Sequence, residues 1–212
     1  MKLFSRGAAP ASSPVRLHVG CGQEAISGWV NIDNKALPGV DRVLDVTSGL
    51  PFEDVRSIYA EHFLEHLSFD DGLIFLRECR RVLRDDGVLR LSTPNLDWVY
   101  LTHYRVGRWT DDEQPLLDCF QMNRAFHGWG HRFLYNAPML DAALRAAGFA
   151  TVRLHRYGES GMAELRGLER HQTWEDTPEL PHVIVAEAEG RAGARPIPEK
   201  WLAEFREAVS IR

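Results

Sequence analysis

Two histidines and two glutamates recur in the short segment EHFLEHL, residues 61–67. His62 and His66 are four residues apart, and so are Glu61 and Glu65. Positions four apart share one face of a helix, and paired histidines with this spacing bind zinc in hydrolases that carry the HExxH motif. Here the glutamate does not directly follow the first histidine, and no third ligand is evident. We therefore expect no metal site at this segment.

The elements that must position these residues alternate between β-like and helical patterns. Helical spacing of apolar residues covers 68–87 and 136–149. Alternation of strands and crossover helices predicts an α/β fold, in which a doubly wound, mainly parallel, seven-stranded Rossmann-like sheet has helices on both faces. The predicted strands are 15–20, 29–33, 42–46, 57–61, 87–94, 150–158 and 182–189.

Composition indicates an ordinary globular protein. The chain has 212 residues, 44% of them hydrophobic, with a formal charge of −5 that gives no support for nucleic-acid binding. Its three cysteines, at positions 21, 79 and 119, form no framework, so we expect a cytoplasmic protein. No apolar stretch is long enough for a membrane span. We expect a flexible tail over 1–14, one domain over 15–190 and an amphipathic C-terminal tail over 191–212.

The segment LHVGCGQEAISGWVNID, residues 17–33, carries a glycine turn directly after a predicted strand. Gly20 and Gly22 let the backbone approach a ligand, although Ala25 replaces the last glycine of the dinucleotide fingerprint. Asp33 and Asp45 follow the next two strands, where carboxylates bind a ribose and an adenine amino group. Each aspartate alone is more simply explained as the cap of a turn. Three successive strand ends together favour a nucleoside ligand.

These motifs resemble the class I S-adenosylmethionine-dependent methyltransferases of the broad bacterial group with GCG…GWVNID, D…LPF and HFLEHL. The resemblance covers residues 15–95 and continues faintly through GHRFLYNAPMLDAALRAAGF. It implies that S-adenosylmethionine is the cofactor. His18 stands where the family usually has an acidic residue, and Glu24 stands at the usual third glycine, where it is a candidate replacement for that acid. The implied cofactor-binding residues are His18, Gly20, Cys21, Gly22, Asp33, Asp45, Val46, Glu61 and His62.

The family order of strands also places His62 at the carboxyl end of strand 57–61, with His66 in the following turn. An oxygen acceptor needs a group that takes its proton. We expect one of four histidines to face the acceptor, although each alone is also typical of a hydrogen-bonded structural residue. The candidate catalytic residues are His62, His66, His127 and His131.

Residues 95–135, rich in Trp, Tyr, His and Arg, follow the fifth predicted strand and are expected to cover the carboxyl ends of the strands. Aromatic and polar side chains there suit a sugar, a polyol or an aromatic ring, and equally an ordinary helix packed on the sheet. The candidate acceptor-binding residues are Asn95, Asp97, Trp98, Tyr104 and Arg105.

The sequence thus predicts a methyltransferase that acts on a small molecule or a saccharide by in-line transfer. Two alternatives remain: a protein that binds S-adenosylmethionine or its demethylated product without catalysis, and a nicotinamide-dependent oxidoreductase. The missing half of the dinucleotide fingerprint disfavours the oxidoreductase. The oligomeric state stays open, with a homodimer as one option.

Overall fold

The computed structural model describes residues 14–170, 177 and 179–210. Within these residues seven strands form one sheet in the order β3-β2-β1-β4-β5-β7-β6. Neighbours from β3 to β5 are parallel, whereas β7 is antiparallel to both β5 and β6. The predicted fold class is confirmed, with one mixed edge. The strands are β1 (Val15–Val19), β2 (Val30–Asp33), β3 (Arg42–Val43), β4 (Val55–Glu61), β5 (Leu83–Pro94), β6 (Phe149–His155) and β7 (Val183–Arg191).

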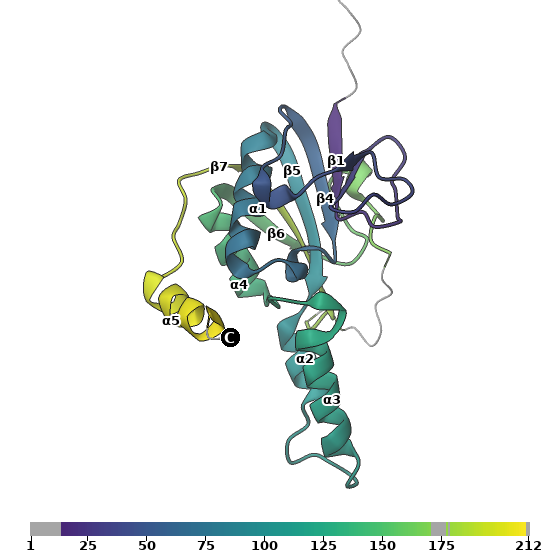
Figure 1. Cartoon of the computed structure of the whole chain (residues 1–212), viewed down its shortest axis with the longest axis vertical. Helices are drawn as coiled ribbons and strands as arrows, with labels where there is room; N and C mark the ends of the chain where they lie inside the picture. Colours follow the sequence, from purple (N-terminus) through teal and green to yellow (C-terminus); the bar gives the residue numbers. More distant parts are fainter. Residues whose placement is uncertain (1–13, 171–176, 178, 211–212) are drawn as a thin grey trace, which may run out of the picture.

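The main core lies between the sheet and two helices, α1 (Phe69–Val82) and α4 (Ala137–Ala146), which cover one face (Figure 1). Ser68 caps α1 by accepting a hydrogen bond from the Asp71 amide, as expected for a helix start. The opposite face is covered by residues 156–169, which include the 3₁₀ helix η4 (Ala163–Leu165). Leu165 packs there against Tyr59 and Val88 of the sheet.

Residues 20–29 connect β1 to β2 through turns, with no helix among them. The buried amide of Asn31 organises this connection. Its Oδ1 accepts from the Ile26 amide at 2.8 Å, and its Nδ2 donates to Asp41 at 2.9 Å. One side chain thereby links the loop after β1 to the loop after β2, so the two loops that follow the first parallel strands are held together.

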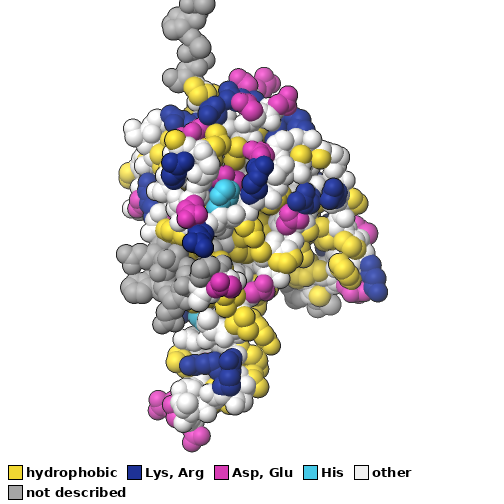
Figure 2. Space-filling model, turned by 180° about the vertical axis from the view of Figure 1, so that it is seen from behind, with side chains coloured by type: hydrophobic (Ala, Val, Ile, Leu, Met, Phe, Trp, Pro, Cys, Tyr) yellow, Lys and Arg dark blue, Asp and Glu magenta, His cyan; other side chains and the backbone are white. Residues whose placement is uncertain are grey.

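Helices α2 (Leu96–His103) and α3 (Gln114–His127) pack on each other and project beyond the carboxyl ends of the strands (Figure 1). A small cluster of Val99, Ala125 and Leu134 joins the projection to the rest of the fold. Figure 2 shows hydrophobic side chains gathered along it; Leu116 and Phe120 are among its exposed residues. None of the helices in the described part of the chain is long and apolar enough to cross a bilayer.

Beyond β7 the chain forms α5 (Glu199–Ser210). Leu202 contacts the main core, and the ring of Phe205 lies 5.5 Å from that of Phe133. Arg206 forms an ion pair with Asp70 of α1 at 2.6 Å. The expected N-terminal tail, residues 1–13 above all, lies outside the described residues.

Candidate active site

Gly20 and Gly22 turn the chain directly after β1. Both have a positive φ, +67° and +52°, which glycine adopts without steric cost. A Cβ atom on Gly20 would lie 2.3 Å from the ring of Phe63, so only glycine fits against that ring. The predicted glycine turn therefore leaves bare backbone facing the ends of β2 and β4.

Asp33 ends β2 with its carboxylate already oriented by backbone amides. Oδ2 accepts a hydrogen bond from the Gly22 amide at 2.9 Å, and Oδ1 accepts one from the Lys35 amide at 3.0 Å. Each carboxylate oxygen can accept more than one hydrogen bond. The side chain that the sequence assigns to a ribose is thus fixed beside the glycine turn and keeps capacity for two hydroxyl groups.

Asp45 caps the 3₁₀ helix η1 (Val46–Ser48) through bonds from the Thr47 amide at 2.9 Å and hydroxyl at 2.7 Å, both to Oδ1. The hydroxyl bond, and then the amide bond, hold the pKa of this carboxyl below its usual range. A hollow of about 50 Å³ brings Asp45 and Val46 together with Gly20 and Asp33. The structure thus gathers the tips of the first three strands at one place.

His18 of β1 is buried and stacks on Tyr59, with ring centroids 5.4 Å apart. Its Nδ1 donates to Oδ1 of Asn31 at 3.2 Å. Burial lowers the pKa of His18, so the ring is neutral at neutral pH. Glu24 forms an ion pair with the Arg170 side chain, and Glu61 accepts a hydrogen bond from the Arg170 amide at 2.8 Å. Both acidic residues near the glycine turn therefore contact the same residue.

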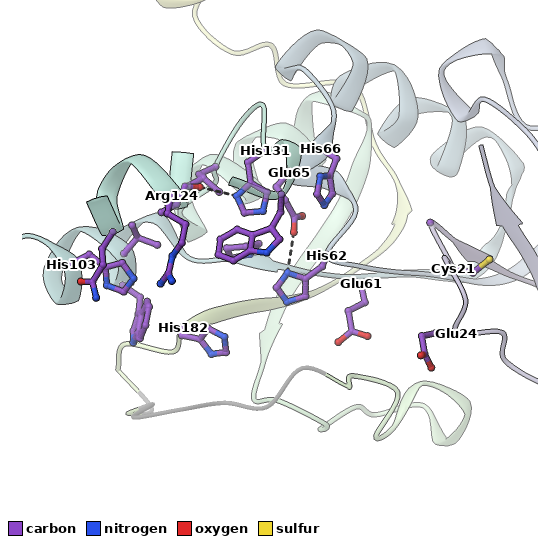
Figure 3. A pocket seen from close by; sticks show the side chains of 18 of the residues that line it. Cys21, Glu24, Glu61, His62, Glu65, His66, His103, Arg124, His131 and His182 are labelled. Atoms are coloured by element: carbon purple, nitrogen blue, oxygen red, sulfur yellow. Dashed lines mark hydrogen bonds and ion pairs between the residues drawn. The ribbon is translucent and has the colours of Figure 1, made fainter. Parts of the chain in front are cut away.

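A cavity of about 940 Å³ opens beside the carboxyl ends of β1, β4 and β5 (Figure 3). Gly20 borders both this cavity and the smaller hollow that contains Asp33. A ligand that crosses the glycine turn can therefore occupy both. The end at the glycine turn is lined by His18, Gly20, Cys21 and Glu24, and the middle by Glu61, His62, Glu65, His66 and His131.

His62 follows β4 with a φ of +46°, a strained conformation for this residue type. Its Nδ1 lies 3.0 Å from Oε1 of Glu65 (Figure 3). The Thr93 hydroxyl donates to Oε2 of Glu65 at 3.0 Å. The Glu65 side chain is fully buried. His62 therefore has a fixed ring orientation at the cavity wall, with a carboxylate behind it.

His66 lies in the 3₁₀ helix η2 (Leu64–His66), so it does not share a helical face with His62. Its ring lies 5.3 Å from that of His131. Ligand atoms of Glu65, His66 and His131 lie within 4.8 Å of one another, and these three residues could hold a metal ion. His131 directly follows the 3₁₀ helix η3 (Gly128–Gly130), which comes after α3. The spacing within EHFLEHL could not reveal this ligand. The expected absence of a metal stays a prediction.

Of the other predicted site residues, some line the cavity and some do not. His127, the last residue of α3, is exposed and is not among the cavity-lining residues. Trp98 lines the cavity, whereas Asn95 caps α2 and donates to the Pro181 carbonyl at 2.8 Å. Asp97 is exposed and accepts a hydrogen bond from Asn136.

Tyr104 and Arg105 begin the loop between α2 and α3, away from the cavity lining. Tyr104 is exposed. Arg105 binds the carboxylate of Asp118 at 2.6 Å, and the Trp109 indole donates to the same group at 3.0 Å. The Arg105 guanidinium, above all, lowers the pKa of Asp118 to about 2. Arg105 therefore stabilises the helical projection instead of lining the cavity.

Several cavity residues were not singled out from the sequence. Two belong to α3, one ends α2, one lies between α3 and α4, and one precedes β7; no spacing in the sequence connects them. The four within 95–135 share only the high content of aromatic and basic residues there, and the one that precedes β7 lies outside that segment. These residues are His103, Gln121, Arg124, Trp129 and His182.

Residues 17–91 match the family model of the methyltransferase domain. No curated protein matches the sequence. Among solved structures, a SAM-dependent methyltransferase from Archaeoglobus fulgidus superposes with a TM-score of 0.51 at 16% identity, covering 84% of this chain and 86% of that one. The CMeT domain of the citrinin polyketide synthase superposes with a TM-score of 0.50 at 16% identity, covering 85% of this chain and 47% of that one.

PigF, solved with SAH, is similar at 17% identity and a TM-score of 0.48, with 82% of this chain and 50% of that chain covered. The chain thus spans about half the length of PigF and of the citrinin synthase structure. The matched segment contains the glycine turn, both strand-end aspartates and the His62–Glu65 pair. Residues 17–91 thus match the methyltransferase domain, as the resemblance predicts, and the chain has the fold of the class I S-adenosylmethionine-dependent methyltransferases.

Proposed function

We propose that this protein transfers a methyl group from S-adenosylmethionine to a small-molecule or saccharide acceptor. The observation that carries the proposal is the meeting of two spaces at Gly20. The hollow at Asp33 and Asp45 suits the adenosine part of the cofactor, and the large cavity suits the methionine part. Because the hollow is smaller than a nucleoside, the purine would extend over the exposed Asp45 and Asn34.

The residues at the glycine turn fit this cofactor. A Cβ on Gly20, which borders both spaces, would collide with the Phe63 ring, and Asp33 offers a preoriented carboxylate to the ribose. Glu24 and Glu61 lie where a positively charged amino group would be bound, in place of the family's acid at position 18. S-adenosylmethionine supplies a methyl group that is already activated on a sulfonium.

The protein's part in the reaction is to align the acceptor, exclude water and accept its proton. We assign the proton to His62, whose Nδ1 is held by Glu65. Since a carboxylate only accepts hydrogen bonds, Nδ1 carries the ring proton and Nε2 is the basic nitrogen. Glu65 would stabilise the imidazolium that forms when His62 takes the acceptor proton. The proposal includes a cytoplasmic setting, which the three free cysteines support.

Isothermal titration with S-adenosylhomocysteine and with NAD tests the cofactor assignment and separates the oxidoreductase alternative. We expect the sulfur compound to bind and Asp33→Asn to weaken it about 10- to 100-fold, because a charged acceptor of ribose hydroxyls is lost. Asp54→Asn is the matched control, since Asp54 is exposed before β4, at the opposite end of that strand from Glu61. Binding of NAD alone would contradict the proposal.

An acceptor screen with labelled S-adenosylmethionine separates an enzyme from a binding protein. The enzyme transfers label to at least one small acid, polyol, phenol or saccharide. Tight binding of the cofactor with no transfer to any acceptor class would favour the non-catalytic alternative.

A further inference from the structure

The end of the cavity farthest from the glycine turn carries a cation that no carboxylate in the described part of the chain neutralises. Arg124 of α3 lines this end. Its side chain lies over the ring of Trp129, with the guanidinium carbon 5.5 Å from the ring centroid, and it forms no ion pair with residues 14–170, 177 or 179–210. A guanidinium presents a planar fork of donors that matches carboxylate and phosphate.

Charge is separated along the cavity. Glu24, Glu61 and Glu65 all lie on the side of the glycine turn and of β4, and each contacts other protein groups there. Arg124 and Gln121 come from the opposite side, one helical turn apart on α3. Figure 3 shows the Arg124 side chain extending into the same space that His103 and His182 face. A ligand spanning the cavity thus meets acidic groups at one end and a basic group at the other.

His103 adds no charge to this end. Burial, followed by the positive charge of Arg124, lowers the pKa of His103, so at neutral pH its ring is neutral. The fixed charge that faces the cavity from the helical projection is therefore that of Arg124. The Gln121 amide can donate hydrogen bonds to whatever the guanidinium binds.

The Trp129 ring forms an aromatic wall of the cavity beside Arg124. Trp129 lies between Gly128 and Gly130 with a φ of +54°, which is rare for a bulky residue. The ring is exposed, and it lies 5.7 Å from the ring of His131. Strained backbone of this kind concentrates at binding sites. The indole therefore presents a flat face between the guanidinium and the histidines in the middle of the cavity.

We propose that Arg124 binds an anionic group of the methyl acceptor, so that the acceptor is a small organic acid or phosphate ester whose ring or carbon skeleton packs on Trp129. This inference rests on the proposed function and narrows its substrate class. The cavity of about 940 Å³ is at the upper end of the range of about 300–1,000 Å³ typical of single-ligand sites. It has room for the methionine part of the cofactor together with a small acceptor.

Titration of the protein saturated with S-adenosylhomocysteine tests the anion site. The probes are benzoate, phenyl phosphate and the neutral benzamide. We expect one of the two anions to bind more tightly than benzamide, and Arg124→Gln to weaken that anion about tenfold or more while leaving benzamide unchanged. Whether benzoate or phenyl phosphate responds identifies the acceptor's charged group. Arg124→Lys should retain part of the affinity, because it keeps the charge and loses the fork.

Arg108→Gln is the matched control, since Arg108 is an exposed arginine of the same projection that does not line the cavity. The inference is overturned if benzamide binds as well as both anions, if no probe binds, or if Arg124→Gln and Arg108→Gln have equal effects. The affinity for S-adenosylhomocysteine, measured first, separates failure of the proposed function from failure of the Arg124 assignment. If the unaltered protein does not bind S-adenosylhomocysteine, the proposed function is contradicted. If it binds this compound but shows no preference for the anions, only the Arg124 assignment is contradicted.

Discussion

Nδ1 of His62 lies 3.0 Å from Oε1 of Glu65, and the carboxylate is fully buried while the imidazole borders the large cavity. Thr93 donates to the other carboxylate oxygen. A histidine oriented by a buried carboxylate has one defined tautomer and a stabilised imidazolium form. The two residues are three positions apart in the sequence, so a single turn after β4 builds the pair.

The first prediction concerns this pair. His62→Gly should lower the rate of methyl transfer by about 10²- to 10⁴-fold, because the proton acceptor is removed. Glycine tolerates the φ of +46° at this position, and the space left by the ring can admit free imidazole. Added imidazole should therefore restore part of the rate with labelled cofactor, and it should not accelerate the unaltered protein. Full activity in the variant, or a deficit that imidazole does not change, would exclude His62 as the base.

The second prediction concerns the glycine turn. Gly20→Ala should abolish detectable binding of S-adenosylhomocysteine, because its Cβ would lie 2.3 Å from the Phe63 ring and force that ring or the turn to move. Gly107→Ala is the matched control: its φ of +73° is similar, and a Cβ there meets nothing within 4 Å. It should show the backbone cost alone, a small loss of thermal stability with normal binding. Equal affinities in the two variants would show that the contact with Phe63 does not matter.

The third prediction concerns metal ions. Both oxygens of Glu65 accept hydrogen bonds, from His62 and Thr93, and Nδ1 of His131 donates to the Ala125 carbonyl at 2.8 Å. We expect purified protein to hold well below one equivalent of zinc per chain, and chelation to leave methyl transfer unchanged. Elemental analysis and activity after EDTA treatment check this. One tightly held equivalent that is lost in His131→Ala would instead establish a metal centre at Glu65, His66 and His131.

The sheet and the meeting of the glycine turn with the strand-end aspartates were predictable because they depend on local patterns. Each strand-end aspartate follows its own strand within the same short segment, so strand order alone brings Asp33 and Asp45 together. Predicted element boundaries were wrong where the same residue type fits two kinds of element. The helical pattern is predicted to extend over 68–87, but Gly87 lies inside β5, where a side chain would meet the Val55 carbonyl at 2.8 Å. The helix therefore ends at Val82.

The part of the cavity lined by the helical projection was not predictable residue by residue. The loop between α2 and α3 folds on the buried Asp118, which draws Arg105 away from the cavity. Arg124 reaches the cavity only because α3 returns along α2. Such contacts depend on the packing of two helices whose apolar faces are weakly marked, and one sequence does not reveal which charged residue pairs and which faces the ligand.

The fourth prediction concerns Arg90, whose side chain is fully buried on β5. It forms ion pairs with Glu169 at 2.6 Å and Glu187 at 2.7 Å. Arg90→Leu should lower the free energy of unfolding by about 3–5 kcal/mol, because two carboxylates lose their buried partner. Arg153→Leu is the control, since the Arg153–Glu189 pair is exposed on the neighbouring strand β6 and should contribute about 1 kcal/mol or less.

Urea unfolding followed by circular dichroism measures both variants. Because Glu169 precedes Arg170, which contacts Glu24 and Glu61, Arg90→Leu should also weaken binding of S-adenosylhomocysteine. Equal stabilities for Arg90→Leu and Arg153→Leu would mean that the buried pairs add nothing beyond surface pairs.

The fifth prediction concerns acid and the helical projection. The pKa of Asp118 is lowered to about 2, chiefly by its bonds from the Arg105 guanidinium. A carboxyl whose pKa is depressed in the folded state contributes its full stabilisation above its ordinary pKa of about 3.9, and loses it as the pH falls toward the folded value. The contacts of Asp118 with Arg105 and Trp109 should therefore be intact at pH 5 and weaken progressively between about pH 4 and pH 2.

The indole proton of Trp109, which Asp118 accepts at 3.0 Å, reports this change directly. The hydrogen-exchange rate of this proton, measured by NMR, should rise between about pH 4 and pH 2. The ion pair of Asp141 with Arg145 on α4 serves as a comparison, because its carboxylate is exposed. In the Asp118→Asn variant the indole proton of Trp109 should exchange rapidly already at pH 5, because the amide cannot provide two charged acceptors to Arg105 and Trp109. Unchanged protection of the indole in that variant would show that helix packing alone holds the loop, and that the ion pair is dispensable.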